Sequence, residues 1–284
     1  GHISHFSMGS DIADFNNDAL PDILSLDMLP EDNRRQKLLY GPDTYEKYQS
    51  MLRNGFYHQI MRNMLQLNNG DGTFSEIGQL AGVSNTDWSW APLMADFDND
   101  GWKDLFVSNG YLRDYTNRDF VSYYADQRIQ EQRGEQSDAL LDIIARMEST
   151  KTPNYIFRNN GDLTFTKKSA EWGFDELVLT NGAVHADLDL DGDLDLVLNN
   201  VNAPARIYEN QVAGGHFIKI ALKNTGPNRY AVGAKVTLEA SGQTLMQEFM
   251  PSRGFQSAMH LPLHFGLGDT KVVERGKGDG VFIT

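Results

Sequence analysis

The chain has 284 residues, a formal net charge of −14 and no cysteine. The lack of cysteine excludes disulfides, zinc–thiolate sites and thiol nucleophiles. The negative charge argues against a nucleic-acid partner or an anionic membrane, because phosphate binding relies on clustered Lys and Arg. Many short apolar runs between Asn, Asp and Gly clusters predict a mainly β fold rather than a helical bundle.

An acidic pattern of nine residues occurs three times, at 14–22, 96–104 and 187–195. Each copy runs into a short apolar stretch that predicts a buried strand. In the third copy, five aspartates on alternate positions repel one another strongly, so we expect a cation to compensate them, and oxygen-only ligands indicate Ca²⁺. The spacing begins like an EF-hand, but position 12 is Leu198 instead of a bidentate Glu. Each loop is therefore expected to lie between strands.

The predicted calcium ligands are the side chains at loop positions 1, 3, 5 and 9 and the backbone carbonyl at position 7. With the residue that supplies the carbonyl last in each set, the ligands of the first loop are Asp14, Asn16, Asp18, Asp22 and Leu20; those of the second are Asp96, Asp98, Asp100, Asp104 and Trp102; and those of the third are Asp187, Asp189, Asp191, Asp195 and Asp193. Because the ligands of each set come from one loop that ties two strands together, the ions are expected to be structural rather than catalytic.

The turn residue at loop position 6 differs between the copies. It is Gly101 in the second copy and Gly192 in the third, but Ala19 in the first. A sharp turn at this position favours a left-handed backbone, which costs an alanine roughly 1–2 kcal/mol relative to glycine. We therefore expect two to three calcium ions, with the first loop the least occupied.

The repeat extends beyond the loops. Residues 63–82 recur at 154–173, with the Asn-Asn-Gly-Asp turn and the following Phe74 or Phe165 in the same register. Each unit predicts a strand, a Gly-dependent turn, a second strand that starts at the phenylalanine, and a third strand that runs into the acidic loop. Without its insertions the unit has about 50 residues, the length of a four-stranded propeller blade.

Two insertions near 28–62 and 113–153 interrupt the repeat. Capping residues and apolar stripes predict a helix after Asp43 in the first insertion, and helices near 120–129 and after Ser137 in the second. The domain organisation is therefore residues 1–211 as blade-like units with helical insertions, followed by a second β module.

The second module covers residues 212–284, where the acidic loops stop. The runs 217–222 and 235–239 alternate as strands do, and 264–268 predicts a tight corner that depends on glycine. These features predict a small β domain.

The chain resembles the bacterial FG-GAP/VCBS-repeat proteins that carry a C-terminal ASPIC/UnbV module. The resemblance rests on the three Asp loops, on Thr86-Asp87-Trp88-Ser89-Trp90, and, in the terminal module, on Gly254-Phe255-Gln256-Ser257 and His264-Phe265-Gly266-Leu267-Gly268. It implies a calcium-binding propeller of the integrin-α type that is usually exported, and it implies no reaction. The chain departs from the family at Ala19 and after Val273, where the module lacks the usual Trp-Pro-containing strand and is expected to be incomplete.

Three acidic loops, the first without the strands that should precede it, predict a partial β-propeller: an open, curved array that does not close within this chain. The terminal module is expected to pack on the last blade, and the helical insertions to project from the rim. Because unpaired edges recruit other strands, self-association through open blade edges is a further expectation.

Two function classes follow. The first is a non-catalytic, calcium-stabilised extracellular binding or adhesion module that recognises a protein or a glycan through its loops and insertions. The second is an enzyme on a propeller scaffold, such as a polysaccharide lyase or glycosidase. Trp88, Trp90 and Trp102 could form a platform for a glycan ring, or lie in the core between blades. The sequence contains no run of about 20 apolar residues that would predict a transmembrane segment. Location outside the cell or on a bacterial surface, with an export signal upstream of residue 1, is the expectation.

Overall fold

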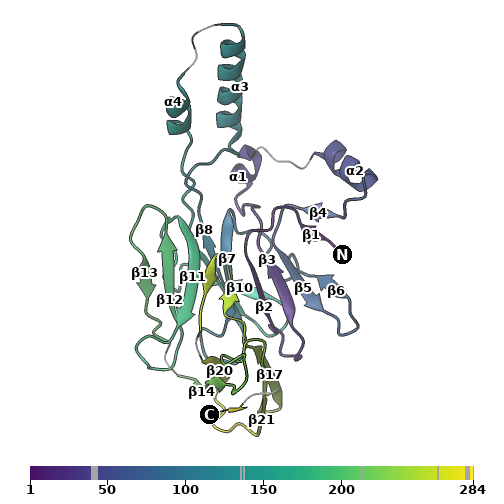
Figure 1. Ribbon diagram of the computed structural model, residues 1–284, viewed down its shortest axis with the longest axis vertical. Helices are drawn as coiled ribbons and strands as arrows, with labels where there is room; N and C mark the ends of the chain where they lie inside the picture. Colours follow the sequence, from purple (N-terminus) through teal and green to yellow (C-terminus); the bar gives the residue numbers. More distant parts are fainter. Residues whose placement is uncertain are drawn as a thin grey trace.

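The computed structural model describes residues 1–39, 44–134, 136, 138–212, 214–260, 262–278 and 282–283. With 36% strand and 13% helix the chain is mainly β, which confirms the expected fold class at this level. Figure 1 shows sheets side by side in the middle of the molecule, helices at one end and most of the C-terminal strands at the other.

The first two sheets have the same topology, in which four antiparallel strands lie in chain order. The first sheet contains β2 (Ser10–Ala13), β3 (Asp22–Ser25), β5 (Met64–Asn68) and β6 (Phe74–Glu76). The second sheet contains β7 (Ser89–Ala95), β8 (Asp104–Asn109), β9 (Tyr155–Asn159) and β10 (Phe165–Lys167). In the turns before β6 and β10, Gly70 and Gly161 have left-handed φ angles of 74° and 72°, which explains why glycine recurs there.

The third sheet contains three strands: β11 (Thr180–Ala186), β12 (Asp195–Asn200) and β13 (Arg206–Tyr208). No fourth strand pairs with β13 among the described residues. In all three sheets, an acidic loop joins the first strand to the second, so the repeated sequence unit corresponds to a repeated sheet.

The first strands of the sheets, β2, β7 and β11, lie next to one another, with β7 in the middle. One apolar core, which includes Phe15, Leu65 and Phe165, lies between the first and second sheets. A second core, which includes Phe106 and Leu196, lies between the second and third. None of the sheets closes into a ring within the described part of the chain.

The two insertions form the helical end of the molecule (Figure 1). They contain α1 (Asn33–Leu38), α2 (Tyr45–Arg53), α3 (Arg118–Gln132) and α4 (Leu140–Ala145), with β4 (Gln59–Ile60) pairing in parallel with β1 (Ile3–Ser4). Asp43, the expected cap of α2, lies outside the described residues, and Thr44 caps this helix instead. Arg35 of α1 forms ion pairs with Asp87 at 2.9 Å and Asp114 at 3.0 Å, which attaches the first insertion to the segment just before β7 and to the second insertion.

The C-terminal module consists of short paired strands around its own core, which includes Val236, Leu238 and Phe265. Its strands are β14 (His216–Ile220), β15 (Leu222–Lys223), β16 (Lys235–Ala240), β17 (Gln243–Glu248), β18 (Ser252–Arg253), β19 (Ser257–Ala258), β20 (Leu263–Gly268), β21 (Arg275–Gly278) and β22 (Phe282–Ile283). The run 217–222, expected as one strand, is divided because β14 pairs with β20 whereas β15 pairs with β22.

The module contacts all three sheets, so the expectation that it packs on the last blade was too narrow. Its β18–β19 hairpin reaches β2, β7 and β11. From this hairpin, the Arg253 guanidinium donates to both carboxylate oxygens of Asp11 at 2.8 and 2.5 Å and to the Met94 carbonyl at 2.7 Å. A charged group that leaves water needs such a complete set of acceptors, and these acceptors lie on β2 and β7.

Candidate metal centres

The first aspartate of each loop holds the loop backbone in its turn. Asp96 accepts hydrogen bonds from Asp100 N at 3.1 Å and Gly101 N at 2.8 Å. Asp14 accepts in the same way from the backbone of Asp18 and Ala19, and Asp187 from that of Gly192. The chain therefore wraps around this carboxylate in all three copies, as the repeated spacing indicates.

The last aspartate of each loop ties the loop to the third strand of its sheet. Asp104 accepts from Phe97 N at 3.1 Å and from Asn159 N at 2.9 Å. The equivalent acceptors are Asp22 and Asp195, whose donors on the third strand or just after it are the backbone N–H groups of Asn68 and Asn210. Position 9 is thus an architectural position whether or not it binds an ion.

Position 6 of each loop has the left-handed backbone expected for it. The φ angles are 65° at Ala19, 94° at Gly101 and 103° at Gly192. The alanine of the first loop is therefore strained relative to the glycines, which confirms the conformational part of the sequence argument.

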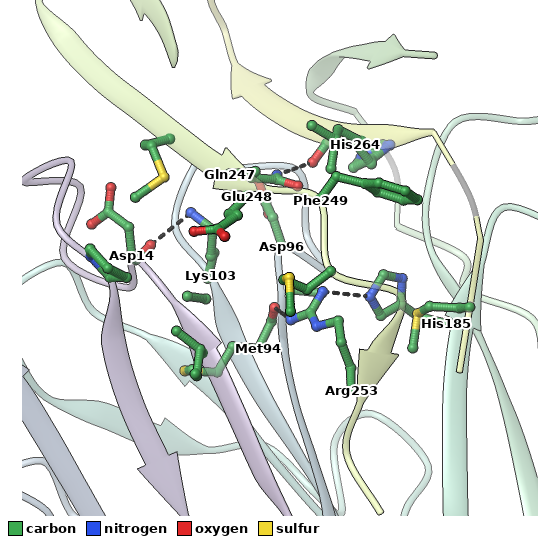
Figure 2. A pocket seen from close by; sticks show the side chains of 18 of the residues that line it. Asp14, Met94, Asp96, Lys103, His185, Gln247, Glu248, Phe249, Arg253 and His264 are labelled. Carbon is green, nitrogen blue, oxygen red and sulfur yellow. Dashed lines mark hydrogen bonds between the residues drawn. The ribbon is translucent and has the colours of Figure 1, made fainter. Parts of the chain in front are cut away.

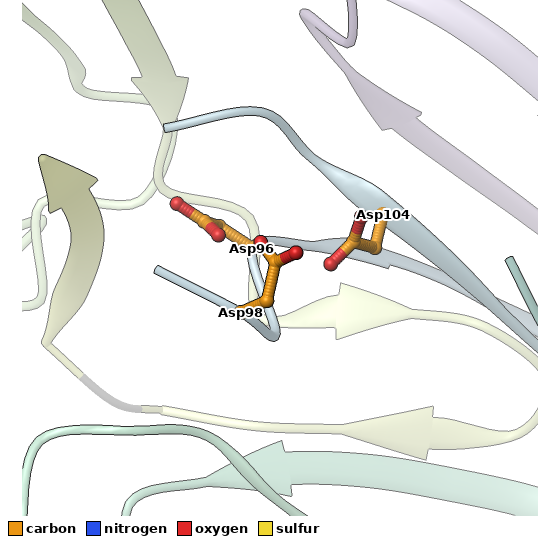
Figure 3. A group of neighbouring side chains, drawn as sticks. All are labelled: Asp96, Asp98 and Asp104. Carbon is orange, nitrogen blue, oxygen red and sulfur yellow. The ribbon is translucent and has the colours of Figure 1, made fainter. Parts of the chain in front are cut away.

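The structure brings carboxylates together in two of the three loops. Oxygens of Asp96, Asp98 and Asp104 lie within 4.8 Å of one another (Figure 3), and a second group joins the loop positions 1, 3 and 5 of the third copy, Asp187, Asp189 and Asp191. Within the described residues, the first loop forms no such group. There, Asn16 donates to Asp18 at 2.9 Å, so two of its predicted ligands contact each other.

Burial and repulsion from neighbouring carboxylates disfavour the ionised form of Asp96, Asp104 and Asp193. Burial, followed by the charge of Asp100, raises the pKa of Asp96 to about 8. Burial and the charge of Asp98 likewise raise the pKa of Asp104, and burial with the charge of Asp191 raises the pKa of Asp193 to about 6. A cation at each cluster would restore ionisation, because an opposite charge favours the charged form.

Three basic side chains, which the sequence analysis did not identify, already compensate part of this charge. Arg158 contacts Asp98 and Asp100, both at 2.7 Å. Buried Lys103 donates to the Asp14 carbonyl at 2.7 Å, and Lys219 of the terminal module forms an ion pair with Asp187. The available signal was the repeat itself: Arg158 replaces Leu67 and Glu209 of the other copies, and Lys103 replaces Pro21 and Leu194.

The third loop fits a hard cation best. Asp187 Oδ1 and Asp193 Oδ1 are both buried and accept no hydrogen bond from the described residues. A buried carboxylate oxygen without a donor is costly, and Ca²⁺ takes six to eight oxygen ligands of this kind. Lys219 contacts the other oxygen of Asp187, Oδ2, so one predicted ligand of the third loop already has a basic partner. In the second loop two predicted ligands have one, because Arg158 occupies an oxygen of Asp98 and one of Asp100.

The terminal module covers the second and third loops. His264 Nε2 lies 2.7 Å from Asn99 Oδ1, and a side chain at Gly266 would overlap the Asp96 carboxylate. At the third loop, a side chain at Gly192 would overlap the Phe217 ring of β14. Contact alone explains Gly266, whereas contact and a left-handed φ of 103° both explain Gly192.

A cavity of about 150 Å³ lies between the inner strands and the module (Figure 2). Asp14, Asp96, Lys103, Arg253 and His185 all line it. Burial, then the charge of Arg253, lowers the pKa of His185 to about 3, so this imidazole is neutral in the folded state. The cavity is an internal polar junction between the sheets and the module.

A larger hollow, of about 570 Å³, lies at the helical end and is lined by aromatic and methionine side chains, among them Phe6, Met28, Met61, Trp88 and Tyr115. Trp88 stacks on Tyr111 with ring centroids 3.9 Å apart and is only 2% exposed. Trp88 is thus a core residue. Trp90 donates its indole N–H to the Gly110 carbonyl, and Trp102 packs against Gly161. The three tryptophans therefore do not form a shared exposed platform.

Repeated antiparallel sheets with acidic loops and a terminal β module define the class of this protein. The model of the FG-GAP-like repeat matches residues 56–107 and 137–198, and the ASPIC and UnbV model matches residues 224–276. The chain belongs to the FG-GAP-repeat proteins that carry a C-terminal ASPIC/UnbV domain, as the resemblance implied. No curated protein matches the chain. Among the described helices, none has the length and apolar character needed to cross a membrane.

Proposed function

We propose that this chain is a non-catalytic, calcium-stabilised extracellular module that binds a protein or a glycan, and that its sheets are blades of an open propeller. The observation that carries the calcium part is the third loop, where two buried carboxylate oxygens lack a donor: Asp187 Oδ1, within the carboxylate cluster, and Asp193 Oδ1, from the same loop. FG-GAP-like repeats and an ASPIC/UnbV domain support an extracellular repeat module.

Calcium in this proposal has a structural role. Asp187, Asp189, Asp191 and Asp195 would hold the ion in the third loop with the Asp193 carbonyl, and the corresponding residues would do so in the second. The ion would supply the positive charge that the clustered carboxylates lack. Because the loops connect the first two strands of a blade and lie under the terminal module, that charge would stabilise both the blade and the junction.

The helical end supports the binding part of the proposal. Its hollow of about 570 Å³ falls in the size range of ligand pockets, and its lining is mostly apolar. Trp88 Nε1 is buried there without an acceptor among the described residues. The insertions frame this end with exposed aromatic side chains, among them Tyr57 and Tyr115, at 53% each. Such side chains are common at binding surfaces.

The contacts of the loops favour binding over the alternative of a polysaccharide lyase or glycosidase. A glycosidase needs two carboxyl groups that face the substrate, one as the acid and the other as the base or the nucleophile. The position-1 and position-9 aspartates instead accept backbone N–H groups of their own loops and sheets. Incubation with a panel of glycans, with analysis of products, separates the two functions: retention without product supports the proposal, and cleavage contradicts it.

The calcium proposal is tested by thermal melts with EGTA and with millimolar Ca²⁺, together with calorimetric titration. At 100 times the dissociation constant, one site stabilises the fold by about 2.7 kcal/mol. Asp187→Asn should weaken the tightest site at least tenfold, whereas Asp175→Asn, an exposed carboxylate outside the loops, should leave it unchanged. Coincident melts with and without Ca²⁺ would refute the structural role.

A further inference from the structure

The first two sheets end in a short fourth strand that begins with a phenylalanine. In the second sheet, Phe165 of β10 pairs with Asn159 of β9, and in the first, Phe74 of β6 pairs with Asn68 of β5. The two fourth strands are also fixed by one equivalent hydrogen bond, Lys168 N to Ile156 O and Ile77 N to Leu65 O, both at 2.8 Å. The chain thus contains two examples of how this sheet is completed.

The third sheet follows the same plan up to the point where its fourth strand should begin. Asn159 donates its side-chain amide to the carbonyls of Phe15 and Lys103, and Asn210 donates to the equivalent carbonyls of Phe97 and Leu194. Beyond Asn210 the chain continues to β14 instead of turning back. The outer edge of β13 is therefore unpaired among the described strands.

The missing strand coincides with a hollow of about 680 Å³ between the second and third sheets. Its lining includes Trp172, Tyr208 and Asn210. At the junction between the first and second sheets, the corresponding space contains Phe165, whose N–H donates to the Ala81 carbonyl at 3.0 Å. The second junction thus offers apolar side chains that an entering side chain would contact, among them Ile156, Trp172 and Leu196, next to charged groups such as Lys168, and it lacks the entering side chain itself.

The register identifies the groups that would bind an added strand. Ile207 pairs with Val197 on its inner side, as Ile156 pairs with Phe106 in the second sheet. Ile156 O accepts from Lys168 N, directly after β10. The N–H and C=O of the equivalent Ile207 are therefore directed outward, and two residues later the same holds for Glu209. The side chain of Ile207 is 68% exposed.

We propose that β13 is a docking edge for an extended segment of a separate protein, which adds as an antiparallel fourth strand and places an apolar side chain opposite Asn210. Main-chain hydrogen bonds would supply affinity, and the hollow beside Trp172 would select the apolar residue. The proposal rests on the proposed binding function and specifies a protein partner for it.

A second copy of this chain fits this edge poorly. Two copies could place an aromatic residue opposite Asn210 by pairing their β13 strands with Tyr208 at that position. In this register Glu209 of one copy lies opposite Glu209 of the other. Like charges directly opposite each other destabilise a strand pair. Tyr208 is moreover already stacked on Phe174 of its own chain, with ring centroids 4.7 Å apart.

The chain itself provides the probe for the test, a synthetic peptide with the sequence of residues 162–169. Binding is measured by calorimetry, and the site by hydrogen exchange of individual amides. We expect new protection at Ile207 and Glu209, while Tyr208, whose N–H faces β12, stays unchanged. Ile207→Pro removes the backbone N–H that points outward. An edge strand tolerates proline, so the variant should fold but bind the peptide at least tenfold more weakly. Ile207→Ala keeps the donor and should stay within about threefold of the parent, about 0.7 kcal/mol.

A peptide with Phe165→Asp should also lose at least tenfold in affinity. Absence of binding at about 1 mM peptide, or equal binding by the proline variant, would overturn the proposal. Protection of the same amides that rises with protein concentration without peptide would assign the edge to a second copy and would overturn it too. Thermal melts of each variant report its folding. Failure here leaves the calcium proposal standing, because the calcium titrations do not involve β13.

Discussion

Single residues distinguish three loops that share one spacing. Ala19 has the left-handed backbone that glycine adopts more readily. Arg158 pairs with two aspartates of the second loop, whereas Lys219 pairs with one aspartate of the third. The third loop has a glycine, and its buried carboxylate oxygens include two without a donor. The loops are therefore expected to differ in affinity, with the third the tightest.

Ala19→Gly should stabilise the protein by about 1 kcal/mol, because the left-handed conformation costs glycine less than alanine. It should also tighten calcium binding at the first loop. Urea unfolding measures the first effect and calorimetric titration the second. Ala183→Gly is the control: this alanine is buried in β11 without a positive φ, so the same change should destabilise. A destabilised Ala19→Gly variant would show that strain at position 6 is not what limits this loop.

Arg158→Leu introduces the residue found at the equivalent position of the first copy, Leu67. Without the guanidinium, Asp98 and Asp100 lose their counter-charge, so stability in EGTA should fall by about 1 kcal/mol. Stability in Ca²⁺ should fall less, because the ion replaces the lost charge. The measured quantity is the difference in melting temperature between the two conditions, which should widen. Arg128→Leu, which removes an exposed pair with Glu131 on α3, should leave this difference unchanged.

At the scale of elements, local patterns predicted most of the sheets. The recurring phenylalanine after the Asn-Gly turn marks the start of β6 and β10, and the acidic loops mark the connection between first and second strands. The sequence could not predict where the β18–β19 hairpin lies, because its contact Arg253–Asp11 joins residues far apart in the chain. The basic partners of the loops could not be predicted for the same reason. Periodicity reports local structure, whereas these contacts join different repeats or different domains.

The β18–β19 hairpin should depend on its buried ion pair. Arg253→Met leaves Asp11 charged and largely buried without its partner, which should cost about 3–5 kcal/mol. The double variant Arg253→Met, Asp11→Asn removes the unpaired charge and should recover at least half of that loss. Urea unfolding of the single and double variants measures the coupling. Equal stability of the two variants would mean that Arg253 acts through packing rather than through Asp11.

At the scale of the whole molecule, the terminal module joins the sheets. Its hairpin contacts β2, β7 and β11, and β14 and β20 lie against the second and third acidic loops. The sheets form an open array in which this module occupies the side where the inner strands meet. Since loops and module share one interface, a change in the charge of the loops must reach the module.

Removal of calcium should therefore loosen the module before it unfolds the sheets. Without the ion, repulsion among the carboxylates of Asp187, Asp189 and Asp191 acts on a loop that contacts Phe217 and Lys219 of β14. The rate of hydrogen exchange in EGTA should rise at least tenfold in β14 and β20, and less than threefold in β3 and β5 of the first sheet. A tenfold rise corresponds to a decrease of about 1.4 kcal/mol in the free energy of local opening. Mg²⁺ at the same concentration is the matched control, and it should not restore protection because it dehydrates reluctantly and favours octahedral sites. A uniform loss of protection across the module and the sheets would instead mean that the ion stabilises the fold as one unit. Unchanged protection would mean that Lys219 and Arg158 are sufficient to stabilise the loops.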